Sequence, residues 1–303
     1  MEFNGIYTPV ITPYKADFSV DEQAYAAAIE HLISSEVHGI IIAGTTGEYY
    51  AQSMEERQHL LSLAIEIIAG RLPVIGGTGA MRTEDSVALA RYAKAAGVDA
   101  ILIATPPYAV PNGRENADHA LAIDRAANLP VLLYNYPGRM SAEMDEEYLD
   151  RVGRSPNFKA IKESSGDINR VHMLARRYPH IGLSCGMDDQ ALEFFAWGAQ
   201  SWVCAASNFA PLEHIALWKS CHIDNDFRKG RRIMSAMMPL MQELEQGGKF
   251  IQSIKYGVDL CGIPAGVPRL PLKPLNKDEK RSLEQIISTM KTTIARITSE
   301  DGQ

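Results

Sequence analysis

The stretch HGIIIAGTTGE, residues 38–48, decides the fold together with the sequence that follows it. Its run Ile40–Ala43 is apolar at every position, which indicates a strand covered on both faces and therefore a parallel sheet. The next segment, MEERQHLLSLAIEIIAG (54–70), has apolar residues at intervals of three and four, as a core-facing helix does. A second strand-like run, PVIGGTGA (73–80), follows it. The pattern predicts a βα unit that repeats.

The same alternation of strand and helix continues through the first 210 residues, with eight strand-like runs in all. This count predicts a closed (β/α)₈ barrel of the α/β class. An open doubly wound sheet is less consistent with the sequence, because no G-x-G-x-x-G pattern follows the first strand. After Asn208 the sequence is helical in pattern. We therefore expect a barrel domain over residues 1–210 and a C-terminal helical region, packed on the barrel, over residues 211–303.

Composition and charge argue against several classes of partner. The 303 residues include 30 basic and 37 acidic ones that interleave along the chain, so no basic block is present to bind nucleic acid. The longest apolar run is too short to span a membrane, and the opening MEFNGIYTP has no secretory pattern. The four cysteines are far apart and show no metal-site spacing. These features predict a cytoplasmic protein with reduced thiols.

Lys162 lies in FKAIKESSGD (158–167), at the expected end of the sixth strand. In such a barrel the carboxyl ends of the strands face the active site. Only about 0.04% of a free lysine is neutral at pH 7, but apolar surroundings lower its pKa. A neutral amine can attack a carbonyl and form an imine, which withdraws electrons from the neighbouring carbon. The open alternative is that Lys162 pairs with Glu163 or merely extends from the strand end.

Tyr134, one strand earlier in LLYNYPGR, is the expected proton shuttle for that imine. Adjacent strands lie ~4.8 Å apart, so the phenol is within reach of an imine carbon on Lys162. Because the pKa of a free tyrosine is about 10, the phenol needs hydroxyl partners to pass protons at neutral pH. Thr45 and Tyr108, at two other strand ends, are the candidates for this relay. The alternative is a tyrosine that only packs at the barrel rim.

Four motifs make the chain resemble the dihydrodipicolinate synthase and N-acetylneuraminate lyase family of class I aldolases. They are GTTGE (44–48), YNYPGR (134–139), IKESSGD (161–167) and RLPLKP (269–274), and their order and spacing match along nearly the whole chain. The resemblance implies a barrel with a C-terminal helical domain and neither a metal nor an organic cofactor. It also implies a homotetramer, a pair of tight dimers, that binds pyruvate or another 2-oxo acid and an aldehyde or sugar acid.

The resemblance further assigns roles to individual residues. Lys162 would form the imine, Tyr134 would be the acid/base and Thr45 the relay hydroxyl. Tyr108 would reach into the neighbouring subunit's site. The predicted substrate-binding residues are Thr46, which would hold the pyruvyl carboxylate, Val203, which would line the pyruvate pocket, Asp188 and Asp189, which lie where the lyase branch binds substrate hydroxyls, and Arg139, Ser164 and Gly186.

Some positions depart from the biosynthetic synthases of this family. Arg139 matches the arginine that those enzymes use for a distal carboxylate, although it could instead pair with Glu143 or Asp145. KFIQSIK (249–255) replaces the usual N-P-I-P-V-K segment, and bulky residues follow GTTGE. The positions of lysine-feedback contacts hold Met54, Arg57, Met81 and Pro107, and the bulky residues are Tyr49 and Tyr50. These departures predict a catabolic relative without lysine feedback.

Several reactions share the same first intermediate at Lys162. We expect reversible cleavage of a 2-keto-3-deoxy sugar acid first, with dehydration of such an acid or deamination of a hydroxypyrroline carboxylate as alternatives. Condensation of pyruvate with aspartate semialdehyde, the 4-hydroxy-tetrahydrodipicolinate synthase reaction, also remains open. A metal-dependent aldolase is not expected, because the histidines fall mainly outside the strand ends. A non-catalytic sensor of 2-oxo acids is not expected either, because Lys162, Tyr134 and Thr45 occur together.

Overall fold

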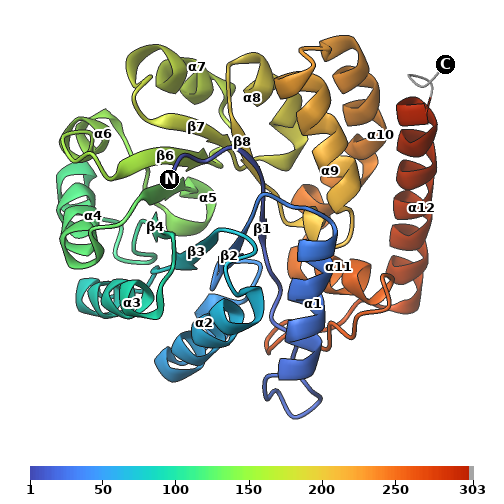
Figure 1. The fold of residues 1–303 in the computed structure, drawn as a ribbon, viewed down its shortest axis with the longest axis horizontal. Helices are drawn as coiled ribbons and strands as arrows, with labels where there is room; N and C mark the ends of the chain where they lie inside the picture. The colour runs from blue at the N-terminus through green and yellow to red at the C-terminus, as the bar shows by residue number, and fades with distance from the viewer. Residues whose placement is uncertain (300–303) are drawn as a thin grey trace.

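The computed structural model describes residues 1–299, and at its centre eight parallel strands form a closed barrel (Figure 1). Each strand pairs with the next along the chain, and β8 closes the barrel on β1 through the pair Gly5–Ser201. The predicted (β/α)₈ architecture is therefore confirmed. The strands are β1 (Gly5–Pro9), β2 (Gly39–Ile42), β3 (Val74–Gly77), β4 (Ala100–Ala104), β5 (Val131–Asn135), β6 (Phe158–Glu163), β7 (Gly182–Cys185) and β8 (Ser201–Val203).

Amphipathic helices surround the barrel and bury their apolar stripes against it. In α2 the buried residues include Leu60, Ala64 and Ile68, at the helical spacing seen in the sequence. A capping box between Ser53 and Glu56 begins this helix. The helices before the last strand are α1 (Glu22–Ser34), α2 (Met54–Ile68), α3 (Thr83–Ala96), α4 (Gly113–Ala127), α5 (Pro137–Met140), α6 (Glu146–Val152), α7 (Ile168–Arg177) and α8 (Ala191–Ala196).

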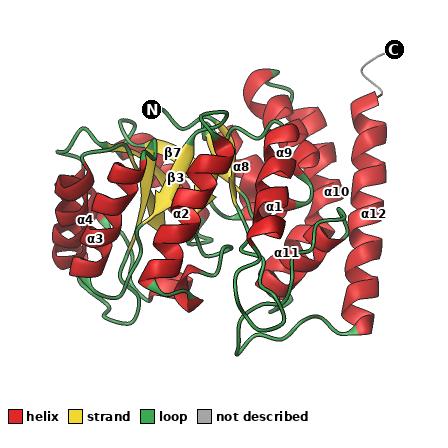
Figure 2. Cartoon of the chain, turned by 60° about the horizontal axis from the view of Figure 1, so that its bottom comes forward, coloured by secondary structure: helices red, strands yellow, loops and turns green. Residues whose placement is uncertain are grey.

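The C-terminal helices form a layer beside the barrel (Figures 1 and 2). They are α9 (Pro211–Trp218), α10 (Phe227–Gln246), α11 (Phe250–Asp259) and α12 (Lys277–Ser299). Of these, α9 packs directly against β1, while α10 packs against α8, α9 and α12. The predicted domain boundary at residue 210 stays a prediction, since α9 shares in covering the barrel. No helix within residues 1–299 has the length and apolar character that crossing a membrane requires.

A buried ion pair connects this helical layer to the loop after β2. Lys255 of α11 has its Nζ 2.8 Å from Glu48 Oε1, and both side chains are almost fully buried. Lys255 also donates a hydrogen bond to the carbonyl of Val267, at 2.8 Å. The backbone N–H of Arg269 donates to Glu48 Oε2 at 2.9 Å, and its guanidinium pairs with Glu56. The GTTGE and RLPLKP motifs, far apart in the sequence, therefore meet in one network.

Candidate active site

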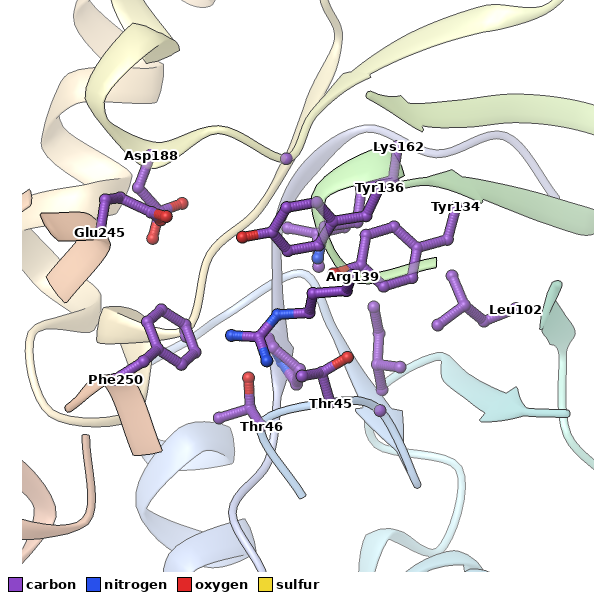
Figure 3. Close-up of a pocket in the computed structure, with 16 residues that line it drawn as sticks. Thr45, Thr46, Leu102, Tyr134, Tyr136, Arg139, Lys162, Asp188, Glu245 and Phe250 are labelled. Carbon is purple, nitrogen blue, oxygen red and sulfur yellow. The ribbon is translucent and has the colours of Figure 1, made fainter. Parts of the chain in front are cut away.

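A pocket opens at the carboxyl ends of the strands, where the sequence predicts the site (Figure 3). Barrel residues form most of its wall, and two residues of the helical layer complete it. The lining residues are Pro9, Ile41, Gly44, Thr45, Thr46, Leu102, Tyr134, Tyr136, Arg139, Lys162, Gly186, Asp188, Val203, Ala205, Glu245 and Phe250.

Lys162 extends from β6 into this pocket beside Tyr134 of β5. The two residues are register partners on adjacent strands, and Lys162 Nζ lies 4.1 Å from the centre of the Tyr134 ring. Burial lowers the pKa of Lys162 below its usual value, while the charges of Asp188 and Glu245 oppose this shift. The lysine thus combines access to the pocket with an increased neutral fraction, as imine formation requires.

The alternative pairing of Lys162 with Glu163 is wrong. Successive side chains of a strand point to opposite faces, so Glu163 points away from the pocket. Its carboxylate lies 3.1 Å from Arg170 Nε and accepts hydrogen bonds from Asn135 Nδ2 at 3.0 and 2.9 Å. Glu163 is therefore a buried structural acid behind the strand, with its own basic partner.

Tyr134 and Thr45 line the same pocket, and the Thr45 hydroxyl is close enough to Tyr134 to affect the pKa of the phenol. Burial raises the pKa of Tyr134 to about 12, and the Arg139 charge and the Thr45 hydroxyl partly oppose this shift. Thr45 Oγ1 is buried and has no hydrogen-bond partner within residues 1–299. A buried hydroxyl without a partner costs free energy, so this atom is a position where a further polar group would be stabilising.

Tyr108 does not enter the pocket of its own chain. It is 91% exposed, and its backbone has a φ of 71°, in the left-handed region that non-glycine residues rarely adopt. A relay from Thr45 to Tyr108 within one subunit is therefore not formed. The other prediction, that Tyr108 enters a neighbouring subunit's site, requires an exposed side chain and stays a prediction.

The other predicted binding residues divide into those that line the pocket and those that support it. Thr46, Gly186 and Val203 line it. A Cβ atom added at Gly186 would lie 2.6 Å from Lys162 Cγ, so a larger residue would displace the lysine. Ser164 is buried and does not line the pocket, and its Oγ donates to the carbonyl of Gly186 at 2.8 Å. Asp189 is half-buried and lies outside the lining.

Arg139 lies beside two aromatic rings and does not pair with the acidic neighbours considered as alternatives. Its Cζ is 5.4 Å from the centre of the Tyr136 ring and 5.8 Å from that of Phe250. Glu143 lies 3.2 Å from Arg170, and Asp145 caps α6 by accepting from the Tyr148 N–H. The guanidinium therefore lines the pocket, close enough to the Tyr136 hydroxyl to lower the pKa of that phenol against the effect of burial, and can bind an anionic group there.

Asp188 is a buried acid at the opposite part of the pocket. Its Oδ1 accepts a hydrogen bond from Trp202 Nε1 at 2.8 Å. Burial, followed by the charge of Glu245, raises the pKa of Asp188 to about 7. Burial also raises the pKa of Glu245, and the charge of Asp189 adds to that shift. The pocket therefore holds two acids that resist being ionised together.

Sequence reasoning missed Glu245, Phe250, Tyr136 and Leu102. Glu245 lies in the methionine-rich stretch of α10, whose pattern is typical of ordinary core packing. Met237 and Met241 of this stretch are buried. Glu245 follows Met241 by four residues and so continues the same helical stripe. An acidic residue on an apolar stripe is the signal that would have pointed to the pocket.

Comparisons with known proteins identify the family. The chain matches the dihydrodipicolinate synthetase family over residues 2–290. It belongs to that family. Its members are class I aldolases and lyases, so the chain is an enzyme of this class. It is 34% identical to 4-hydroxy-tetrahydrodipicolinate synthase of Bacillus velezensis, over 96% of this chain and all of the relative. The synthase of Bacillus subtilis shows 34% identity, also over 96% of this chain and all of the relative.

Solved structures of this dihydrodipicolinate synthetase family superpose closely on the barrel and the helical layer. The 4-hydroxy-tetrahydrodipicolinate synthase of Methylacidiphilum fumariolicum gives a TM-score of 0.91 at 29% identity, over 98% of this chain and 99% of that one. YagE of E. coli K12, solved in complex with pyruvate, gives a TM-score of 0.88 at 28% identity, over 95% and 99%. The names of the relatives favour the condensation alternative over the sugar-acid cleavage expected first from the sequence.

Proposed function

We propose that the enzyme binds pyruvate, or a related 2-oxo acid, as an imine on Lys162. The observation that carries this proposal is a pocket lysine with a lowered pKa beside the buried phenol of Tyr134. The neutral amine attacks the keto carbon, the carbinolamine loses water, and the resulting iminium withdraws electrons from C3. Loss of a C3 proton then gives an enamine, which attacks the carbonyl carbon of an aldehyde, and the reverse sequence cleaves such a bond.

Tyr134 is the proposed acid/base of these steps. Its pKa of about 12 keeps the phenol protonated at neutral pH, so it can donate to the leaving hydroxyl of the carbinolamine. The buried, unpaired Thr45 Oγ1 is a suitable next member of the relay. We further propose that Tyr108 of a neighbouring subunit completes it in a homotetramer, which accords with the exposure of Tyr108 here.

The keto acid itself is proposed to bind next to Lys162. Thr46, with backbone amides of its loop, would hold the carboxylate, and Val203 would contact the methyl group. Gly186 leaves space for the ligand because any side chain there would meet Lys162. These roles need neither a metal nor an organic cofactor, and we expect the enzyme to work in the cytoplasm.

Two second substrates are supported by specific observations. Aspartate semialdehyde carries a carboxylate that suits the guanidinium of Arg139, and the names of the relatives favour this synthase reaction. We place it first for that reason. A 2-keto-3-deoxy sugar acid carries hydroxyls that suit the Asp188 carboxyl, which supports aldol cleavage as the second candidate. Dehydration and deamination share the same imine and belong in the same assay.

Borohydride reduction in the presence of pyruvate tests the proposed imine. We expect a mass increment on Lys162 in the intact protein, mapped by peptide analysis, and none in Lys162→Ala. Incubation with pyruvate and aspartate semialdehyde, and separately with sugar acids and a hydroxypyrroline carboxylate, then ranks the reactions. An intact protein that never acquires a reducible adduct with any 2-oxo acid would overturn the proposal.

A further inference from the structure

Glu245 is the one acidic side chain that the helical layer adds to the pocket lining within residues 1–299. It lies in the last turn of α10, which packs against the segment that contains Asp188. In Figure 3 Asp188 and Glu245 occupy one side of the pocket and extend toward its interior. The barrel and the helical layer thus each supply one carboxyl group to the same wall.

The Glu245 carboxyl is available to a ligand. None of the hydrogen bonds or ion pairs between residues 1–299 engages it, and the side chain is half-buried at the pocket. Asp188 differs, because one of its oxygens already accepts from Trp202. A carboxyl group has acceptor oxygens in both of its protonation states, so an unpaired one at a pocket wall can accept a hydrogen bond from a donor on the ligand.

A basic group of the same pocket lies near enough to Glu245 for the Arg139 charge to lower the pKa of that acid, against the effect of burial. Arg139 presents a guanidinium held against the rings of Tyr136 and Phe250, and Phe250 follows Glu245 after a short turn. In Figure 3 the Arg139 guanidinium extends toward the side of the pocket where Glu245, Asp188 and Phe250 lie. A molecule that carries both a carboxylate and a hydrogen-bond donor would satisfy Arg139 and Glu245 together.

We propose that Glu245 is a specificity-determining residue that accepts a hydrogen bond from an ammonium or hydroxyl group of the second substrate. This inference rests on the proposed function, because it presupposes that a keto acid occupies Lys162. Aspartate semialdehyde supplies an ammonium group beside its carboxylate, and a polyhydroxylated aldehyde supplies a hydroxyl. The two sources share the donor that Glu245 recognises, and they differ in whether Arg139 is also used.

Matched pairs of aldehydes test this role. Aspartate semialdehyde is compared with succinate semialdehyde, which lacks the ammonium group, and glyceraldehyde is compared with propanal, which lacks the hydroxyls. Each is assayed for condensation with pyruvate in the wild type, Glu245→Gln, Glu245→Leu and Glu243→Gln. Glu243 lies on the same helix but outside the pocket lining, so its variant controls for the loss of a charge.

We expect the wild type to prefer the donor-bearing member of one pair. That preference in kcat/KM should fall about 10- to 100-fold in Glu245→Leu, fall less in Glu245→Gln, whose amide oxygen still accepts a hydrogen bond, and stay unchanged in Glu243→Gln. Borohydride trapping of pyruvate at Lys162 should be unaffected in all four proteins. The pair that shows the loss identifies the source of the donor.

Three outcomes would overturn the inference. Normal trapping with an unchanged preference in both Glu245 variants removes Glu245 from substrate selection but leaves the proposed function standing. Loss of trapping in folded Glu245 variants shows that Glu245 acts on Lys162 rather than on the second substrate. Absence of a trapped adduct in the wild type overturns the proposed function and this inference together.

Discussion

Lys162 in the barrel pocket and Lys255 beneath the helical layer both lie in apolar surroundings but differ in their polar partners. Burial lowers the pKa of both. Lys255 has an ion pair with Glu48 at 2.8 Å and a carbonyl acceptor, whereas the ion pairs found within residues 1–299 do not include Lys162. Burial alone therefore does not make a lysine reactive. The lysine that we propose to be reactive, Lys162, is the one that lines the pocket and has no fixed ionic partner.

The largest expected effect is that of truncating Lys162, which tests the difference between the two lysines. We expect Lys162→Ala to lose activity by on the order of 10⁴-fold or more, because the covalent intermediate no longer forms. Its thermal stability should be equal to or higher than that of the wild type, since a desolvated amine is removed. Steady-state assays with the preferred substrate pair and a melting curve check both parts. Turnover at wild-type speed would contradict the comparison.

Truncation of Lys255 should have the reverse effect. Lys255→Ala leaves Glu48 buried without its partner, so we expect the free energy of unfolding to fall by about 3–5 kcal/mol. Urea denaturation measures this loss. The double variant Lys255→Met with Glu48→Gln removes both charges and should recover part of the stability. A Lys255→Ala protein as stable as the wild type would show that this ion pair does not fasten the two layers.

Tyr134→Phe tests whether the phenol beside Lys162 transfers protons during the reaction. The variant keeps the ring 4.1 Å from the amine but removes the proton donor, so kcat should fall by about 10²- to 10³-fold. The adduct with pyruvate should still form, but more slowly. Rapid-quench borohydride trapping separates imine formation from later steps. Unchanged kcat would remove Tyr134 from the proton path.

The smallest expected effect is a pH dependence of stability from Asp188. Its pKa is raised from 3.8 to about 7 in the fold, so the native state favours the protonated form. The stability that this proton contributes is complete below about pH 4 and is lost as the pH rises through 7. Asp188→Asn should therefore stabilise the protein by about 1 kcal/mol at pH 8 relative to pH 5. Melting temperatures at the two pH values test this, and an equal change at both would contradict it.

The fold could be predicted from local patterns because each strand is a short apolar run and each helix has a regular apolar stripe. The β2 and α2 segments show this directly. The strand-end rule likewise identified Lys162, Tyr134 and Thr45, because parallel strands bring their carboxyl ends to one face.

The remaining parts of the site depend on packing that no local pattern contains. Glu245 reaches the pocket because α10 packs beside the segment after β7, a long-range contact. Ser164 is predicted to bind substrate, but its hydroxyl donates a hydrogen bond to the carbonyl of Gly186. The sequence predicts sugar-acid cleavage first, whereas the names of the relatives favour condensation with aspartate semialdehyde. This new order rests on the relatives rather than on any residue in the motifs.

The ion pair between Glu48 and Lys255 affects which relatives can exchange segments with this chain. A chimera that takes its barrel from one homologue and its terminal helices from another brings together a loop acid and a helix base that were not selected as a set. Crossovers near residue 210 should give a stable protein only where both parents carry the matching charges. This ion pair therefore determines which homologues can be combined by gene shuffling.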